Sequence, residues 1–458
     1  MTPRADGSGA TGAAGVGSVA PAGVSSGAAG PGVSVLGPAA FPSPRLTRGG
    51  ADAAAAITSD ELRIPERIEV GADPGKTFEV AGPRARLFFE PARTRAAIVT
   101  CGGLCPGLNN VIRSAFLELH YGYGVAEVIG FRGGYAGLDP QSKLEPVVIT
   151  PAFVDNIHLS GGTILGSSRG PVDIGRAVDN LIARGVDILF TVGGDGTQRG
   201  ANALFQEARR RGHALSVVGV PKTIDNDVQF VSRTFGFMTA VQEAARVLEC
   251  AHTEVRSVPG GIAVVKLMGR HAGFITAAAT VASQDVNFAL IPEVPFELPA
   301  LLEALEQRMR ERSHAVIAVA EGAGQPLLDA DTGRRDASGN VKLRDIGQFL
   351  RAQIEGHFEA RGLPAVLRYF DPSYLIRSRP ANCEDAIMCD QFARHAVHAG
   401  MAGKTGLVIG FLHERFIHVP IEQLCAGSRR VDPNGAWWRS VLAATGQPQL
   451  VTPPEGSA

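Results

Sequence analysis

The amino-acid sequence predicts an α/β fold with two doubly wound, mostly parallel sheets and an active-site cleft between them. Short runs of β-branched and other apolar residues alternate with longer stretches in which apolar residues recur at helical spacing. Strands that are apolar along their whole length belong to parallel sheets whose two faces are covered by helices. The length of 458 residues also exceeds one ordinary core, which favours two domains.

The expected strands and helices alternate along the chain. Strands are predicted at 96–100, 187–192, 215–220, 262–267, 288–291, 314–320 and 406–411. Helical spacing is clearest at 177–184, 237–250 and 301–312. Several of these strands run directly into glycine-rich or charged loops. Ligands of open parallel sheets bind at the carboxyl ends of the strands, so these loops are the candidate functional sites.

The pattern also divides the chain into domains. The first domain is predicted to span 96–235 and to return at 371–446, and the second to occupy 236–370. Residues 59–95 are expected to form an N-terminal embellishment packed on the first domain.

Both ends of the chain differ in composition from the middle. Residues 1–58 are mainly Ala, Gly, Ser, Pro and Val, with almost no charge and few large apolar side chains. Such a segment buries too little surface to offset the entropy lost on ordering, so it is predicted to be disordered. Residues 447–458 are expected to form a loose tail.

The charge balance excludes some classes of partner. Lys and Arg total 44 against 45 for Asp and Glu, so no basic surface is expected for nucleic acid or an anionic membrane. No apolar run approaches the roughly 20 residues that span a bilayer. The six cysteines are scattered through apolar contexts, which favours reduced thiols in a cytoplasmic protein.

A glycine-rich loop, Gly193–Thr197, follows the strand at 187–192. Its backbone N–H groups are unobstructed by side chains, as a phosphate loop requires. Asp195 is a carboxylate that can hold Mg²⁺, although it also suits the N-cap of a following helix. Because several unrelated kinase families carry a similar string, the loop indicates a nucleotide-phosphate site rather than a particular substrate.

A second loop, Thr223–Asp227, follows the strand at 215–220 and contains two carboxylates. Burying two like charges without partners is costly, so both are expected to face a polar cleft. Transfer of a phosphoryl group to an alcohol requires a carboxylate that accepts the hydroxyl proton. Asp225 and Asp227 are both candidates, and residue chemistry alone does not choose between them.

Three further loops carry weaker signals. The glycines at 102–107 suit either a phosphate loop or a tight turn between a strand and a helix. The loop at 161–170 ends in Arg169, whose guanidinium donates two hydrogen bonds to phosphate, although an ordinary exposed loop has similar composition. Arg270 follows a glycine at a strand end and is a candidate anion ligand, whereas His271 reads as a structural histidine.

Taken together, these motifs resemble the 6-phosphofructokinase family. The likeness runs from about Gly82 to about Phe411, with the motifs in family order. Within the family, the chain is similar to the ATP-dependent group of plants and trypanosomatids. The segments that carry this second likeness are 81–84, 87–89, 102–109, 196–200, 336–340, 345–347 and 371–377.

The resemblance implies a reaction and its ligands. The γ-phosphoryl group of MgATP would pass to the 1-hydroxyl of D-fructose 6-phosphate, giving fructose 1,6-bisphosphate and ADP, a step of glycolysis. Mg²⁺ is the implied cofactor, and ATP and fructose 6-phosphate are the implied partners. A homotetramer or homodimer is expected on the same grounds.

The resemblance also assigns roles to residues. The ATP site would comprise Gly103, Arg169, Gly170, Gly194, Asp195, Gly196 and Thr197, with Asp195 at the metal. Asp225 takes the role of the base, Thr223 contacts the transferring phosphate, and Asp227 supports the metal or the loop. The sugar-phosphate site would comprise Thr223, Ile224, Asp225, Met268, Gly269, Arg270, Glu321, Arg368, Tyr374 and Arg377, with Arg368 supplied by a neighbouring subunit.

Two residues bear on the phosphoryl donor. Lys222 is shared with pyrophosphate-using relatives and would add positive charge near the donor phosphates. In those relatives an aspartate stands at the position of Gly196, where it would obstruct the nucleotide's α-phosphate. Glycine leaves that space open, so ATP is the expected donor. Gly261 replaces a subunit-crossing arginine of the bacterial pattern, which makes sugar-phosphate contacts across a subunit interface less certain. Leu104 replaces an acidic residue of that pattern in the first glycine-rich turn.

Three other functions remain as alternatives. One is the pyrophosphate-dependent version of the same enzyme. Another is a catalytically silent regulatory subunit, against which the presence of Asp195, Asp225 and Arg270 argues. The last is a lipid or nicotinamide-nucleotide kinase, which would share only the Gly193–Thr197 loop.

Overall fold

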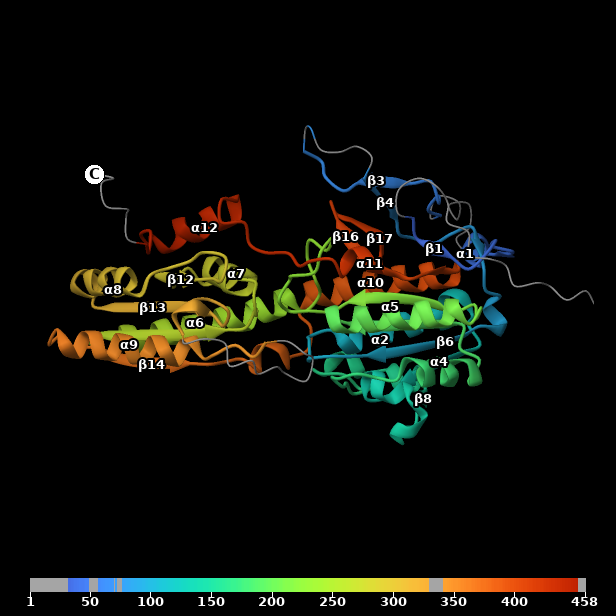
Figure 1. The fold of residues 1–458 in the computed structure, drawn as a ribbon, viewed down its shortest axis with the longest axis horizontal. Helices are drawn as coiled ribbons and strands as arrows, with labels where there is room; N and C mark the ends of the chain where they lie inside the picture. Colours follow the sequence, from blue (N-terminus) through green and yellow to red (C-terminus); the bar gives the residue numbers. More distant parts are fainter. Residues whose placement is uncertain (1–31, 49–56, 70, 72–75, 329–340, 452–458) are drawn as a thin grey trace, which may run out of the picture.

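The computed structural model describes residues 32–48, 57–69, 71, 76–328 and 341–451. They form two α/β units placed end to end, each built around its own sheet (Figure 1). The predicted fold class is confirmed.

The first unit contains a nine-stranded sheet in the order β3-β4-β17-β16-β10-β9-β6-β7-β8. Its parallel centre consists of β16 (Leu407–Leu412), β10 (Ser216–Pro221), β9 (Ile188–Gly193), β6 (Arg95–Thr100) and β7 (Glu127–Phe131). On one side, β17 (Arg415–Pro420), β4 (Thr77–Val80) and β3 (Arg63–Pro65) continue it in antiparallel pairs. On the other, β8 (Val147–Val148) pairs antiparallel with β7.

Helices pack on this sheet in pairs. The longer ones are α2 (Leu108–Leu117), α4 (Ile174–Ala183), α5 (Asp195–Arg210) and α10 (Cys383–Met401). Helix α2 packs against α10, and α4 against α5. A π-helix, η3 (Glu118–Tyr123), continues α2, and the short α3 (Pro151–Val154) lies beyond β8. The central strands are therefore buried throughout.

The second unit has a four-stranded, fully parallel sheet in the order β12-β13-β11-β14. These strands are β11 (Gly261–Leu267), β12 (Phe288–Leu290), β13 (His314–Ala320) and β14 (Val366–Phe370). Its helices are α6 (Phe237–Arg256), α7 (Phe274–Ser283), α8 (Leu298–Arg312) and α9 (Ile346–Ala360).

The antiparallel side of the first sheet was not predicted. Strands β16 and β17 are joined by a two-residue turn in which His413 and Glu414 both have positive φ, at 51° and 58°. Such turns favour Asn-Gly or Asp-Gly, so His-Glu gives no recognisable hairpin signal.

The prediction of disorder over 1–58 is wrong for part of that segment. Residues 1–31 and 49–56 lie outside the described residues, but β1 (Ser34–Val35), β2 (Phe41–Pro42) and α1 (Arg45–Arg48) are formed. Strand β1 pairs antiparallel with β15 (Lys404–Thr405), and β2 with β5 (Arg86–Leu87). Pairing with distant strands satisfies backbone groups in a way that local composition does not reveal.

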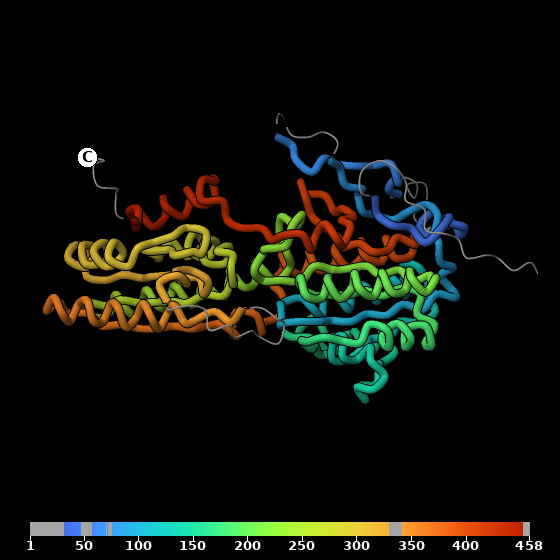
Figure 2. The backbone as a smooth tube through the Cα atoms, in the orientation of Figure 1, coloured from blue at the N-terminus to red at the C-terminus, as the bar shows by residue number. Residues whose placement is uncertain are grey.

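The C-terminal expectations also need correction. After α11 (Ile421–Leu424), the chain crosses to the second unit, where α12 (Ala436–Thr445) packs against α7 and β12 (Figure 2). Residues 436–446 therefore do not lie on the first unit. Nor is the start of the expected tail loose, because Leu450 is buried and its carbonyl accepts a hydrogen bond from the Glu297 N–H at 2.8 Å. Residues 452–458 lie outside the described residues.

Candidate active site

A cleft of about 1240 Å³ lies where the carboxyl ends of the strands of both sheets face each other. Most residues predicted for the site line this cleft: Gly103, Arg169, Gly170, Gly194, Asp195, Gly196, Thr197, Lys222, Thr223, Ile224, Asp225, Met268, Arg270, Glu321, Tyr374 and Arg377, together with Asp227. The structure thus brings together loops that are far apart in the sequence.

Two predicted residues are placed differently. Gly269 lies in the turn between Met268 and Arg270, with a φ of +140° that favours glycine. Arg368, on β14, is not part of the cleft wall, and its Nε donates to Glu254 Oε1 at 3.0 Å. Within one chain, Arg368 is therefore directed to a different partner.

The first phosphate loop connects β9 to α5. Helix α5 begins at Asp195, and its N-cap is Gly194, which makes no side-chain capping bond. The alternative in which Asp195 caps this helix is therefore wrong. A Cβ added at Gly196 would have only Arg199 Nη2 nearby, at 3.8 Å, so the cleft is open at this position. Unpaired N–H groups at the start of a helix favour an anion there.

Three cations converge on the peptide of Gly102 and Gly103. Lys222 Nζ donates to the Gly103 carbonyl at 2.6 Å. A Cβ added at Gly103 would lie 2.9 Å from Arg169 Nη2 and 3.3 Å from Arg377 Nη1. A side chain at this position would displace the two guanidinium groups from the backbone of the loop.

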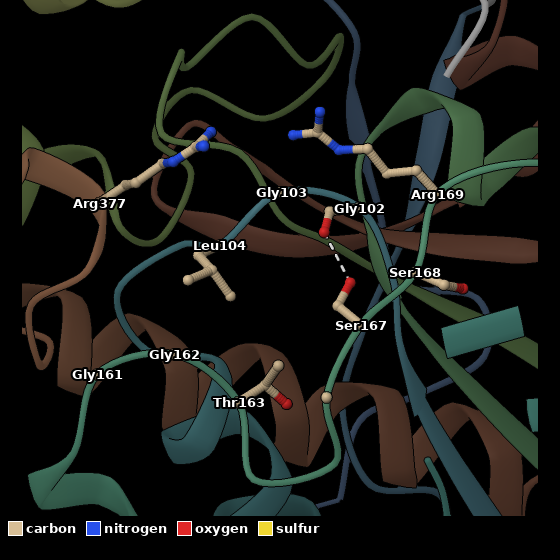
Figure 3. A pocket seen from close by; sticks show the side chains of 11 residues that line it. Gly102, Gly103, Leu104, Gly161, Gly162, Thr163, Ser167, Ser168, Arg169 and Arg377 are labelled. Atoms are coloured by element: carbon tan, nitrogen blue, oxygen red, sulfur yellow. Dashed lines mark hydrogen bonds between the residues drawn. The ribbon is translucent and has the colours of Figure 1, made fainter. Parts of the chain in front are cut away.

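Two of these cations, Arg169 and Arg377, also border a recess of about 560 Å³ that adjoins the cleft. Arg169 and Arg377 point toward each other across its mouth from opposite sides, as Figure 3 shows. The floor is supplied by the loop at 161–168, and Ser167 Oγ donates to the Gly102 carbonyl at 2.6 Å. Glycine N–H groups, hydroxyls and two guanidinium groups make this region suited to phosphate.

In the described part of the chain, no carboxylate forms an ion pair with Arg169, Lys222 or Arg377. Burial lowers the pKa of Lys222, and nearby Asp225 partly opposes that effect. Burial likewise lowers the pKa of Arg377, with Arg169 adding to the effect. The uncompensated positive charge indicates a site for an anionic ligand.

Carboxylates gather on the opposite wall. Burial raises the pKa of Asp225, and the negative charges of Asp227 and Glu321 raise it further. Burial also raises the pKa of Asp227, with Asp195 adding to the effect. Asp225 thus interacts first with its neighbour Asp227 and then with Glu321 of the second unit, whereas Asp227 is affected mainly by Asp195, and the charge of Arg270 opposes the rise in both pKa values. Such mutually perturbed carboxyl groups are characteristic of catalytic sites.

The residues present fit a magnesium ion. Asp195 and Asp227 are electrostatic neighbours, and burial raises the pKa of both. Among the described residues, no hydrogen-bond donor is positioned on the Asp195 carboxylate. Carboxylate oxygens are the ligands that Mg²⁺ prefers, usually one or two of them together with water and substrate phosphates.

Several residues of the cleft wall were not predicted. Lys266 Nζ contacts Asp345 at 3.0 Å and Asp371 at 2.9 Å, and so ties β11 to the segment that carries Tyr374 and Arg377. Ser428 and Arg430 enter the cleft from the C-terminal crossing segment. Lys266 and Asp371 both fall in motifs that were singled out, but no sequence signal pairs them.

The sequence matches a known protein family over more than half of its length. The family model for phosphofructokinase matches residues 95–400. The chain belongs to the phosphofructokinase family. The predicted likeness is therefore confirmed, and the family match removes the lipid or nicotinamide-nucleotide kinase alternative.

Individual phosphofructokinases agree with this placement. The ATP-dependent 6-phosphofructokinase of Amycolatopsis methanolica is 49% identical over 381 residues, which cover 81% of this chain and 83% of that protein. The enzyme of the same name from Trypanosoma brucei brucei is 48% identical over 370 residues, covering 80% and 76%. A pyrophosphate-dependent phosphofructokinase structure from Marinobacter aquaeolei has a TM-score of 0.65 over 79% of this chain and 94% of that chain. At 20% identity it shows the fold alone.

Among the described residues, no helix combines the length and the apolar character needed to cross a membrane. The six cysteines are all free thiols, and Cys101, Cys105 and Cys389 are buried.

Proposed function

We propose that the protein is an ATP-dependent 6-phosphofructokinase. It transfers the γ-phosphoryl group of ATP to the 1-hydroxyl of D-fructose 6-phosphate, and the products are fructose 1,6-bisphosphate and ADP. The observation that carries the proposal is one cleft that holds a buried carboxylate, Asp225, and three cations that form no ion pair with any carboxylate of the described residues. The close relatives named ATP-dependent 6-phosphofructokinase support the choice of donor and acceptor.

The donor side of the cleft belongs to the first unit. ATP is expected to lie along the backbone of Gly103, Gly170, Gly194 and Gly196, with Thr197 in the first turn of α5. Arg169 and Lys222 would neutralise charge that shifts among the phosphate oxygens. A loose, anionic transition state is stabilised chiefly by such positioned cations and N–H donors.

The acceptor side draws mainly on the second unit. Met268, Gly269, Arg270 and Glu321 would contact the sugar, while Tyr374 and Arg377 would hold its 6-phosphate. Glu321 Oε1 already accepts a hydrogen bond from the Arg270 N–H at 2.9 Å, which fixes these two groups relative to each other. The Arg377 guanidinium lies over the Tyr374 ring at 4.9 Å, which holds the arginine at the cleft.

Asp225 is the proposed base. Its carboxylate would accept the proton of the 1-hydroxyl as that oxygen attacks the γ-phosphorus. Thr223 Oγ1 accepts a hydrogen bond from the Asp225 N–H at 3.0 Å, and the Thr223 hydroxyl also bonds to the Asp227 side chain. These bonds fix the threonine in the loop, where it would contact the transferring phosphate. The adjoining Ile224 is buried and keeps the loop seated beneath the substrate.

Asp195 would hold Mg²⁺, with Asp227 supporting it. When bound, the ion supplies positive charge that offsets the negative charge of the donor phosphates. We assign no other role to the metal, since the side chains described above account for binding and proton acceptance.

A pyrophosphate donor is the second candidate, and Lys222 is the observation that favours it. Its Nζ reaches the Gly103 carbonyl, where either donor would place a phosphate. The open space at Gly196 instead favours the larger nucleotide, since a side chain there would enter the cleft.

We further propose a cytoplasmic homotetramer or homodimer. Arg368 lies outside the cleft of its own chain and would serve the sugar phosphate of a neighbouring subunit. Light scattering of the purified protein, compared with activity on dilution, would test whether the assembly is needed for turnover.

The decisive experiment is a coupled assay with fructose 6-phosphate and either ATP or pyrophosphate, in the presence of Mg²⁺. We expect turnover with ATP and little with pyrophosphate. Rapid turnover with pyrophosphate and none with ATP would overturn the donor assignment. Absence of turnover with both donors, in a folded protein that still binds fructose 6-phosphate, would instead support the regulatory subunit.

A further inference from the structure

A short segment between α11 and α12 connects two loops of the cleft. We call residues 428–431 the C-terminal brace, residues 225–232 the base loop and residues 268–273 the sugar-phosphate loop. The base loop belongs to the first unit and the sugar-phosphate loop to the second. The brace contacts both of them at the place where the chain crosses between the units.

The brace is bound to the base loop mainly through Arg429. The Arg429 backbone N–H donates to the Asp227 carbonyl at 2.7 Å. Its guanidinium Nη1 lies within hydrogen-bond distance of the carbonyls of Asn226, at 3.3 Å, and Ser232, at 2.9 Å, and also contacts the Val231 carbonyl. Beside these bonds, Ser428 forms an antiparallel β-bridge with Val228.

The base loop has a backbone that needs such support. Asn226 and Phe230 both have positive φ, at 56° and 59°. Asparagine tolerates this region, but a bulky residue such as phenylalanine is strained there. Strained backbone of this kind persists only where surrounding contacts hold it in place. Arg429 supplies those contacts at both ends of the loop.

The brace is bound to the sugar-phosphate loop through its next two residues. Arg430 Nη1 donates to the His271 carbonyl at 2.9 Å. The Val431 N–H donates to Glu293 Oε1 at 2.9 Å, and the same carboxylate accepts the Gly273 N–H at 2.9 and 3.1 Å. Glu293 therefore joins the brace to the end of the sugar-phosphate loop, at Gly273, three residues after Arg270.

Arg429 is more than a packing residue in this arrangement. Burial lowers its pKa, so the position has a cost for a cation. An apolar side chain of similar size would avoid that cost but would leave the carbonyls of the base loop without their donor. The planar guanidinium also lies 5.0 Å from the centre of the Phe274 ring, the first residue of α7. The same side chain thus contacts both units.

We propose that the C-terminal brace sets the position of the base loop relative to the sugar-phosphate loop, with Arg429 and Glu293 as positioning residues. The proposal rests on the function given above. Arg429 and Glu293 are not part of the cleft wall. Instead the brace holds the Asp225 carboxylate and the Arg270 side chain, which come from different units, in one geometry.

The first test compares Arg429→Met and Arg429→Lys with the wild-type enzyme. Lysine keeps the charge but loses the planar fork, so it is the milder change. Because misplacing a reacting group by about 1 Å costs on the order of 100-fold, we expect kcat to fall about 10- to 100-fold in Arg429→Met and less in Arg429→Lys. KM for both substrates should stay within about threefold, since no binding residue changes.

Arg439→Met is the matched control. Arg439 is an exposed arginine of α12, and its guanidinium donates to the Asn434 carbonyl in the same C-terminal region. This variant should keep wild-type kcat. Thermal unfolding of each protein identifies any loss that arises from unfolding alone. Unchanged kcat in folded Arg429→Met, or an equal loss in Arg439→Met, would overturn the proposal.

The second test addresses the other end of the brace. Glu293→Gln retains one acceptor oxygen, whereas Glu293→Ala retains none, so we expect most of the activity with glutamine and a lower kcat with alanine. If one brace transmits both effects, the double variant Arg429→Met/Glu293→Ala should lose less than the product of the single losses. Strictly multiplicative losses would show that the two residues act independently.

Hydrogen exchange separates the brace from the proposed function. The amides of residues 225–232 should exchange at least about tenfold faster in Arg429→Met than in the wild type, whatever reaction the protein catalyses. A wild type without phosphofructokinase activity would refute the proposed function and leave this measurement valid. Unchanged exchange of the base loop in an active enzyme would refute the brace.

Discussion

Two groups of buried carboxylates in this protein differ in whether the positive charges beside them outweigh the effect of burial. At the junction of β4 with β15 and β17, Glu79 accepts hydrogen bonds from Arg84, lies 2.7 Å from Lys404 Nζ and contacts His418 at 3.2 Å. In the cleft, two further carboxylates raise the pKa of Asp225, and the opposing charges of Arg270 and Lys222 do not offset them. At the junction the negative charge of the carboxylate is balanced by the protein itself, whereas in the cleft it is not.

The pKa values record the same difference. Burial alone would raise the pKa of Glu79, but His418 and Lys404 outweigh it and the net pKa lies well below its usual range. For Asp225, burial and like charges outweigh the opposing charges of Arg270 and Lys222, and the net pKa is raised. A buried carboxylate therefore stabilises the fold only where its partners are built in. Where the neighbouring cations do not offset burial, as at Asp225, we expect the carboxylate to serve ligand binding or catalysis rather than stability.

The largest expected effect comes from Asp225→Asn. Removal of a general base lowers kcat by about 100- to 10,000-fold, which a coupled assay would measure. The same change removes a destabilised buried charge, so the melting temperature of the ligand-free protein should rise by roughly 2 °C at neutral pH. Near-normal turnover would exclude Asp225 as the base. A lower melting temperature would show that Asp225 stabilises the fold as Glu79 does, and would contradict the contrast between the two carboxylates.

At the junction the opposite outcome is expected. Glu79→Ala leaves Arg84, Lys404 and His418 without their shared acceptor, and breaking a buried pair costs about 3–5 kcal/mol. Chemical denaturation should show that loss of unfolding free energy, while kcat per folded molecule stays at the wild-type value. Because the folded-state pKa of Glu79 is lowered, its stabilising contribution is present above the unfolded-state pKa and is lost as pH falls. A variant as stable as the wild type would show that Glu79 is not stabilising.

Gly196→Asp adds a negative charge to the donor side of the cleft and so tests whether this side is arranged to bind an anionic ligand. The added Cβ meets no atom closer than 3.8 Å, so folding should be unaffected. The carboxylate would repel the nucleotide phosphates, and kcat/KM with ATP should fall about 100-fold, the size of one strong electrostatic contact at a transition state. Gly196→Ala, which adds bulk without charge, is the control. Equal losses in both variants would assign the effect to bulk alone.

The smallest effect is a shift in pH dependence. A base must be deprotonated to accept a proton, so kcat/KM should rise with pH through the raised pKa of Asp225. The inflection should lie at least about one unit above the ordinary value of about 3.9. Because Asp225, Asp227 and Glu321 titrate together, the inflection belongs to the group. A profile that is flat above about pH 5 would contradict the raised pKa.

Features that depend on neighbouring residues could be predicted from the sequence, whereas features that depend on contacts between distant segments could not. The loops at Gly193–Thr197 and Thr223–Asp227 each follow a buried strand, so their placement at the carboxyl edge of a sheet required only nearby residues. The different surroundings of Asp225 and Asp227 could not be predicted locally, because Glu321 of the second unit affects only the pKa of Asp225 and Asp195 only that of Asp227.

The remaining parts of the site depend on contacts between distant segments. Arg429 and Val231, which are in contact, are 198 residues apart in sequence, and the stretch around Arg429 has neither a period nor a motif. The pairing of β1 with β15 is hidden for the same reason, since residues 34–35 look like the low-complexity sequence around them. Neither contact leaves a local pattern.

The order of the strands has a consequence for how the chain is assembled as it is synthesised. All four strands of the second sheet lie between Gly261 and Phe370, so that sheet is complete once the ribosome has passed residue 370. The first sheet begins earlier, with β3 and β4, yet β10 cannot pair with β16 until residues 407–412 have emerged. The sheet that starts first is therefore finished last. Until then, the edge of β10 that faces β16 is an unpaired strand edge, and a nascent chain must keep it from other chains.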